Sequence, residues 1–187
     1  TSGSMGSGSG STYASGVTNA TKLDVLKAAV NELFEQYGNE GNVTVRIVSF
    51  AGQGVDRGGG WLTLEAAKNI INGLSASGGT NYADAINDAM VAYGSSGKQA
   101  GADVQNVAYF ISDGAPDSGS GVGTTLQNTW ESFLRTNDIT SYALGIGANV
   151  TTGPLDPVAY NGVTETQIPS QIVTDLSQLA PTLVGVP

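Results

Sequence analysis

Three short stretches of the chain carry hydroxyl and carboxylate side chains of the kind that bind hard metal ions. They are Thr-Ser-Gly-Ser-Met at residues 1–5, Gly-Gly-Thr at residues 78–80 and Ser-Asp-Gly at residues 112–114. Together they offer two serine hydroxyls, one threonine hydroxyl and one carboxylate, which belong to Ser2, Ser4, Thr80 and Asp113. An all-oxygen set of this composition suits a divalent cation such as Mg²⁺, Ca²⁺ or Mn²⁺.

Each stretch also has an ordinary structural interpretation when it is taken alone. Residues 2–11 have the glycine and serine content of a flexible linker. Thr80 stands where the N-cap of a helix is expected, and Asp113 precedes a glycine as it does in many turns. The metal site is favoured only when the three stretches are considered together.

The bulk composition limits the partners of such a site. The chain has 187 residues, of which 40% are hydrophobic and 12% charged, so residues 1–187 are expected to form one folded domain. A net charge of −9, from 7 basic and 16 acidic residues, argues against nucleic acid and anionic membranes as partners. No apolar run approaches the ~20 residues that span a bilayer, so no membrane insertion is expected.

Histidine and cysteine are both absent from the sequence. This excludes thiolate and imidazole metal sites, and with them the usual zinc centres. It also excludes serine–histidine and cysteine–histidine nucleophiles. The remaining candidate for a general base in the three stretches is Asp113, a presumed metal ligand, so we expect the protein not to be an enzyme.

Strands and helices are predicted to alternate along most of the chain. β-Branched and apolar runs predict strands over residues 43–50, 104–112, 139–146 and 163–168. Apolar residues at helical spacing predict helices over residues 21–37, 65–74, 81–93, 124–136 and 170–183, and residues 51–60 are expected to be a glycine-rich loop. This alternation predicts an α/β domain with a mostly parallel sheet covered by helices on both faces.

The elements predicted in this way bring the candidate ligands to one edge of the sheet. Ligands bind such sheets beyond the carboxyl ends of the strands, and Asp113 directly follows one of those ends. The first helix is expected to begin at an N-cap formed by Thr21, with Asp24 three residues later. Lys22 is expected on the outer face of that helix.

The order and spacing of the three stretches resemble those of the von Willebrand factor A (VWA) domain family. That family carries a metal-ion-dependent adhesion site (MIDAS), with an Asp-x-Ser-x-Ser motif after the first strand, a threonine in a second loop and an aspartate in a third. The resemblance covers nearly the whole chain and implies a three-layer, Rossmann-like fold. It also implies that a cation is held by Ser2, Ser4, Thr80 and Asp113, and that a carboxylate of a partner completes the coordination shell of this cation.

The chain departs from the family pattern at its start. The leading aspartate of the motif would precede Thr1, and so would the first, central strand of the sheet. We expect both to be supplied from upstream in a longer chain or by another segment, because residues 184–187 contain glycine and proline and suit a strand poorly. Residues 6–11 lack the acidic pair of a neighbouring metal site, and Asp117 is expected to lie in a solvated loop.

The resemblance implies a cation-dependent binding or adhesion module that captures an acidic group of a protein or glycan ligand. The low lysine and arginine content and the absence of cysteine are similar to VWA domains of large secreted bacterial adhesins, including those with RTX export signals. This predicts an extracellular or cell-surface location, with cell adhesion or biofilm formation as the role. The alternatives are an intracellular VWA module that partners an AAA-type ATPase and a structural spacer with a vestigial metal site.

Overall fold

The structure is a computed structural model that describes residues 2–6 and 20–185. Its α-helices are α1 (Lys22–Glu40), α2 (Leu64–Asn72), α3 (Tyr82–Tyr93), α4 (Thr124–Thr136) and α5 (Leu179–Val184), with short 3-10 turns η1 (Gly3–Gly6), η2 (Asp156–Val158) and η3 (Leu176–Gln178). Its strands are β1 (Val45–Phe50), β2 (Gly54–Leu62), β3 (Asn106–Ser112), β4 (Ile139–Ile146), β5 (Tyr160–Asn161), β6 (Thr166–Gln167) and β7 (Gln171–Val173).

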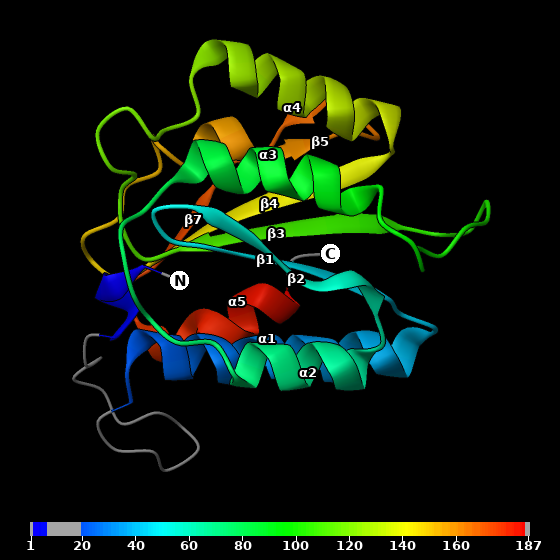
Figure 1. Ribbon diagram of the computed structural model, residues 1–187, viewed down its shortest axis with the longest axis horizontal. Coiled ribbons are helices and arrows are strands. Elements are labelled where there is room, and N and C mark those ends of the chain that lie inside the picture. Colours follow the sequence, from blue (N-terminus) through cyan, green and yellow to red (C-terminus); the bar gives the residue numbers. More distant parts are fainter. Residues whose placement is uncertain (1, 7–19, 186–187) are drawn as a thin grey trace.

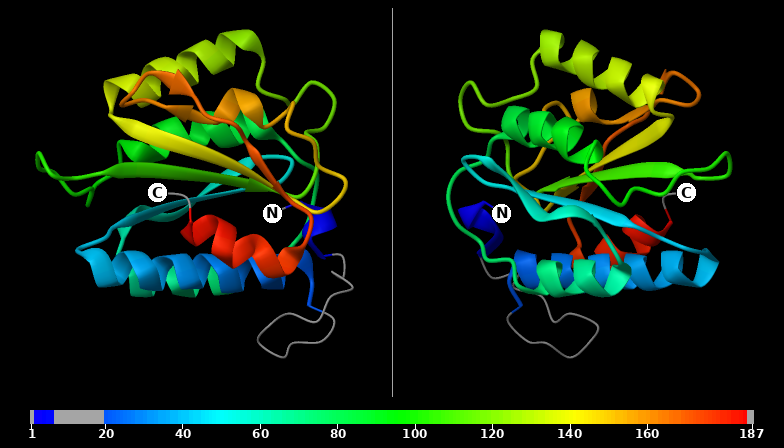
Figure 2. Two further views of the ribbon diagram at one scale, coloured as in Figure 1. Left: turned by 180° about the vertical axis from the view of Figure 1, so that it is seen from behind. Right: turned by 45° about the vertical axis from the view of Figure 1, so that its right-hand side comes forward.

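These elements form three layers, with strands between two layers of helices. Helices α1, α2 and α5 cover one face of the strands, and α3 and α4 cover the other (Figure 1; Figure 2). Helix α1 begins as expected, because the Thr21 side chain and the Asp24 side chain each accept a hydrogen bond from the other's backbone N–H. The predicted α/β class is therefore confirmed.

No helix in the described part of the chain is long and apolar enough to cross a bilayer.

The strands fall into two sheets that are not hydrogen-bonded to one another among the described residues. Strands β1 and β2 form an antiparallel pair. The second sheet has the order β3-β4-β5-β6, with β7 also paired to β4. The β3/β4 and β4/β7 pairs are parallel, whereas β5 joins β4 and β6 in antiparallel fashion. The central layer is thus a mixed sheet with a break between β1 and β3.

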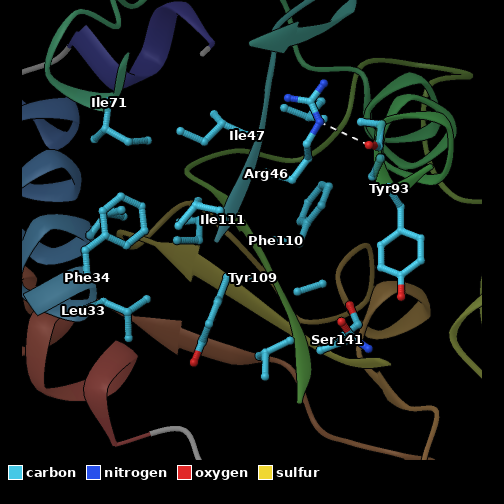
Figure 3. Close-up of a pocket in the computed structure, with 18 of the residues that line it drawn as sticks. Leu33, Phe34, Arg46, Ile47, Ile71, Tyr93, Tyr109, Phe110, Ile111 and Ser141 are labelled. Carbon is cyan, nitrogen blue, oxygen red and sulfur yellow. Dashed lines mark hydrogen bonds between the residues drawn. The ribbon is translucent and has the colours of Figure 1, made fainter. Parts of the chain in front are cut away.

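A cavity of about 750 Å³ occupies this break, and we call it the cleft. Its walls come from both strands and from the helices on each side (Figure 3). Among the side chains that line it are Leu33 and Phe34 of α1, Ile47 of β1, Tyr93 of α3, and Tyr109 and Phe110 of β3. The two sheets meet at one end of the cleft, where the rings of Phe50, the last residue of β1, and Phe110 of β3 stack with centroids 4.9 Å apart. The remaining length of β1 and β3 faces the cleft with one edge unpaired.

Two sequence predictions are wrong in this fold. Residues 51–60 were expected to be a loop, yet most of them lie in β2. The register of β2 with β1 is irregular near Gly58 and Gly59, and these glycines allow the positive φ angles that occur there. Residues 170–183 were expected to be one helix, yet Gln171–Val173 pairs with Leu144–Ile146 of β4 and only Leu179–Val184 is α-helical. In both cases a free strand edge outweighs local helix or loop preference.

Candidate functional site

Asp113 is the centre of the candidate site, and the fold buries it at the carboxyl end of β3. The residue is 2% exposed. One of its carboxylate oxygens, Oδ1, accepts hydrogen bonds from the hydroxyls of Ser2 at 2.7 Å and Ser4 at 2.8 Å. The two serine hydroxyls are themselves 2.9 Å apart. Three of the four predicted ligands therefore converge, although more than 100 positions separate Asp113 from the serines.

The stretch that carries the serines is folded against the body of the domain. Met5 is buried in the core between α1, α5 and β4, and it anchors the 3-10 turn Gly3–Gly6. The backbone N–H of Gly3 donates to the carbonyl of Gly78 at 2.9 Å, which joins this turn to the second predicted stretch. The interpretation of residues 2–6 as linker is therefore wrong, whereas residues 7–11 lie outside the described residues.

Thr80 is 6% exposed and lies in the loop between α2 and α3. This loop is hydrogen-bonded both to the turn that carries the serines and to the loop after β3. Its backbone N–H donates to Asp117 Oδ2 at 2.8 Å, and its carbonyl accepts from the backbone N–H of Asp117, also at 2.8 Å. The N-cap of α3 is Asn81, so Thr80 does not have the capping role that was its structural alternative. We call Ser2, Ser4, Thr80 and Asp113 the rim site.

Asp117 was expected to be solvated, and this is only half correct. The residue is exposed, but its carboxylate is bound by the Thr80 backbone. A side chain at Gly79 would overlap the Asp117 carboxylate, and Gly78 has φ +78°, so both glycines are needed for this approach. Asp117 thus holds the second loop beside the third.

Tyr82 makes a further connection between the same two loops. Its side chain is completely buried, and its hydroxyl donates to the carbonyl of Gly114 at 2.6 Å. Burial, and to a smaller extent the negative charge of Asp113, raise the pKa of the Tyr82 hydroxyl, which therefore remains a donor at neutral pH. Its position on the apolar stripe of a predicted helix gave no sign of this hydrogen bond.

Lys22 is the residue that the sequence placed wrongly. Instead of facing outward, its ammonium lies 3.1 Å from Asp113 Oδ2, the carboxylate oxygen that the serines do not bind. The Lys22 side chain is 17% exposed and that of Asp113 is fully buried. The buried carboxylate is therefore neutralised from within the chain, which is the condition for its burial.

Three oxygens of the rim site, those of Ser2, Ser4 and Asp113, lie close enough together to share one small octahedral cation. Adjacent ligands of octahedral Mg²⁺ lie about 2.9 Å apart, because the metal–oxygen distance is about 2.1 Å. The mutual distances of 2.9, 2.7 and 2.8 Å among Ser2 Oγ, Ser4 Oγ and Asp113 Oδ1 match one face of such an octahedron. No group of three or more acidic, histidine or cysteine side chains suited to a metal occurs among the described residues. Any cation at the rim would thus be held largely by uncharged oxygens.

Comparison with protein families identifies the type of domain. The sequence profile of the von Willebrand factor type A domain matches residues 1–115, which include all four residues of the rim site. No curated protein sequence matches the chain.

Solved structures with the same fold include three that differ in biological setting. A von Willebrand factor type A structure from Catenulispora acidiphila has 19% identity and a TM-score of 0.67, and the match covers 88% of this chain and 37% of that one. Proximal thread matrix protein 1 from the mussel byssus, in a form with a zinc-occupied MIDAS motif, has 16% identity and a TM-score of 0.66, with 88% and 39% covered. The PilB minor pilin of Streptococcus sanguinis has 14% identity and a TM-score of 0.62, with 100% and 58% covered.

These matches span less than two thirds of the length of each solved chain. At such low identities they show that the fold is shared, and they leave ligand, metal and cellular role to be argued from this chain's own residues.

Proposed function

Because this chain belongs to the von Willebrand factor type A domain family, we propose that it is a binding module that works through a divalent cation. Ser2, Ser4, Thr80 and Asp113 would hold the cation, and a carboxylate of another protein or of a glycan would complete its ligands. The observation that carries this proposal is the convergence of two serine hydroxyls on one oxygen of the buried Asp113. We assign the module no catalytic step.

The chemistry of the rim site supports capture of an acidic group. Hydroxyl ligands contribute no formal charge, so a divalent ion held by three of them and one carboxylate keeps a net positive charge. Such an ion attracts an external carboxylate more strongly than one that is surrounded by acidic side chains. The spacing of these three oxygens is that of hydrogen bonds between them, so the proposal includes Mg²⁺, Mn²⁺ and Ca²⁺ alike.

We place the module outside the cell, at a bacterial surface, in an adhesin. The acidic composition and the absence of cysteine support this, as does a minor pilin among the proteins that share the fold. An RTX-type adhesin remains part of the proposal, although no Gly-Gly-x-Gly-x-Asp repeat occurs in the sequence. An intracellular partner of an AAA-type ATPase would be expected to contain more lysine, arginine and histidine than the 7 basic residues and no histidine of this chain.

One observation favours a second candidate, a structural spacer with a vestigial metal site. Lys22 already supplies a positive charge to Asp113. If that ion pair is permanent, the rim site is a structural joint between loops rather than a ligand site.

Titration of the full chain with Mg²⁺, Mn²⁺ and Ca²⁺ by isothermal calorimetry tests the proposal. We expect binding of at least one ion, and its loss in Thr80→Ala and Asp113→Ala. Asp103→Ala, which removes an exposed carboxylate in a different loop, is the matched control and should bind as the wild type does. No heat with any of the three ions would favour the spacer.

We also propose what fills the cleft. A β-strand that runs parallel to β3 and ends beside Ser2 would pair with both free edges and join the two sheets. Ser2 is among the residues that line the cleft, so residues that precede Thr1 in a longer chain are the occupant that we propose. The walls from α1 and α3 are largely apolar, which suits a strand that is buried on both faces. An aspartate at its last position would reach the rim site.

A fusion tests the strand. A segment of about seven residues, apolar and β-branched except for a final aspartate, is placed directly before Thr1. It is compared with the same segment ending in asparagine and with a glycine–serine segment of equal length. We expect both apolar segments to stabilise the domain by several kcal/mol, a rise of roughly 10 °C in Tm, and only the one ending in aspartate to tighten cation binding. Equal Tm values for all three fusions would contradict the proposed strand.

A further inference from the structure

We propose that Lys22 is an internal competitor for the cation position, so that a divalent ion binds the rim site only by displacing the Lys22 ammonium from Asp113. This inference rests on the proposed function. It identifies Lys22 as a residue that sets the affinity of the site for a divalent ion. In the metal-free domain, the Lys22 ammonium takes the part of the cation beside Asp113.

The ammonium binds the same carboxylate that a cation at the rim site would use, at its other oxygen. Asp113 Oδ1 is fully engaged by the hydroxyls of Ser2 and Ser4, and Oδ2 is bound by Lys22 at 3.1 Å. A metal that uses this carboxylate together with the serines would therefore approach a unit positive charge within a few ångströms. The two positive charges repel one another, and one of them has to leave.

The helix itself disfavours a lysine at this position. Lys22 is the first residue of α1, at the end of the helix where the macrodipole is positive and a cation is destabilised. The first turn of α1 contains one acidic residue, Asp24, and this carboxylate is bound by Thr21. Asp113 is therefore the group that holds the Lys22 ammonium in place, and the ammonium is released without loss of a helical hydrogen bond.

The surroundings of Lys22 give it a route outward. Its side chain is 17% exposed, whereas that of Asp113 is fully buried. The stem of the lysine lies beside Gly147, directly after β4, where a Cβ would be 3.6 Å from the Lys22 Cε, so residue 147 places no side chain against it. A flexible four-carbon stem in this position can swing into solvent while Asp113 and the serines stay in place.

Competition predicts effects in opposite directions for stability and for binding. Removal of the ammonium leaves the buried Asp113 charge without a partner, so the metal-free domain becomes less stable. The same change removes the repulsion, so a divalent cation binds more tightly and restores the lost stability. A lysine that only positions Asp113 would instead weaken metal binding when it is removed.

The experiment compares Lys22→Met with the wild-type full chain by calorimetric titration of Mg²⁺ and Mn²⁺ and by Tm with and without each ion. We expect about tenfold or greater tightening of the Kd, a lower metal-free Tm and a larger rise in Tm with metal. Lys22→Arg keeps the charge and should bind as weakly as the wild type does. Lys27→Met is the matched control, because Lys27 lies on the same helix and donates to the Asn72 carbonyl away from the site.

Lys22→Gln and an NMR measurement keep the test valid if Lys22→Met does not fold. Glutamine retains a donor for Asp113 without the charge, so it should fold and bind more tightly than the wild type. In the wild type, the Lys22 Cε resonance should move to the position of a solvent-exposed lysine as Mg²⁺ is added.

The outcomes separate this inference from the proposed function. Equal or weaker affinity in Lys22→Met and Lys22→Gln, with clear binding by the wild type, would overturn the role of Lys22 and leave the binding module standing. Absence of binding in the wild type and in every variant would overturn both.

Discussion

The rim site and the cleft are neighbours, yet they are stabilised in opposite ways. At the rim, polar groups from loops far apart in sequence bind one another, and Asp113 alone receives two hydroxyls and an ammonium. In the cleft, two strand edges face a largely apolar cavity of about 750 Å³ without a strand between them among the described residues. The rim assembles from individual hydrogen bonds and an ion pair between loops, whereas the cleft needs a continuous backbone as its partner.

The difference teaches that a binding site and the sheet beneath it can depend on different parts of a chain. The loops of the rim are joined by short contacts such as Thr80 with Asp117 and Gly3 with Gly78, which do not require a complete sheet. Changes in the cleft should therefore alter the free energy of unfolding, and changes at the rim should alter cation affinity.

The largest expected effect is on the free energy of unfolding, and it compares a side chain in the packed core with one that lines the cleft. Leu134 is completely buried between α4 and its sheet, so Leu134→Ala should reduce the free energy of unfolding by about 3–5 kcal/mol. Leu33 borders the cleft, where its side chain has fewer neighbouring atoms to contact, so Leu33→Ala should cost less, about 2 kcal/mol. Urea unfolding of both variants checks this. Equal losses would mean that the cleft is filled in solution.

A smaller effect is expected at the rim from Asp117→Ala. The variant removes the acceptor of the Thr80 backbone N–H, which should cost about 1–2 kcal/mol of stability. It should also weaken cation binding roughly tenfold, because the Thr80 loop is no longer held beside Asp113. Asp117→Asn keeps an acceptor oxygen and should retain most of both properties. Unchanged affinity in Asp117→Ala would separate Thr80 from the site.

Alkaline pH should reduce the stability that Tyr109 contributes at the cleft. Burial, together with the hydrogen bond to Tyr37, raises the pKa of the Tyr109 hydroxyl, so folding favours the neutral form. That stabilisation is complete below a pH of about 10, where the unfolded chain is also neutral, and is lost as pH rises further and the unfolded chain ionises. Urea unfolding between pH 8 and 11 should therefore show a less steep decline in Tyr109→Phe than in the wild type. Identical slopes would show that Tyr109 is freely solvated.

The smallest effect concerns the start of α1, which carries Lys22 to the rim. Thr21→Ala removes the cap of α1 and should cost about 0.5–1 kcal/mol. The backbone N–H and hydroxyl of Thr21 lower the pKa of Asp24, so this stability is present above the unfolded pKa of about 3.9 and is lost as pH falls further. Thermal unfolding of both proteins at pH 7 and pH 3 should show a difference that is smaller in acid. A constant difference would mean that Asp24 takes no part.

Elements with a strong local pattern could be predicted from the sequence. Helix α4 and strand β4 have the bounds 124–136 and 139–146 that the sequence predicts, because the helix has an apolar stripe and the strand is a run of largely apolar and β-branched residues. Strand β7 could not be predicted in this way. Ile172 was assigned to a helical stripe, yet it pairs in a strand because β4 leaves an edge free there. A pairing between residues 144–146 and 171–173 has no signal within either segment.

The sequence by itself determined the chemical character of the site. Oxygen donors at Ser2, Ser4, Thr80 and Asp113, without histidine or cysteine, limit it to hard cations, and local spacing is sufficient to place each donor in a loop. Only the tertiary structure decided which charge Asp113 meets. Lys22 has a helical neighbourhood that predicts an outward side chain. It turns inward because Asp113, a buried carboxylate at the end of a strand distant in sequence, needs a counter-charge. Electrostatic pairing of this kind depends on distances in space, which local patterns do not contain.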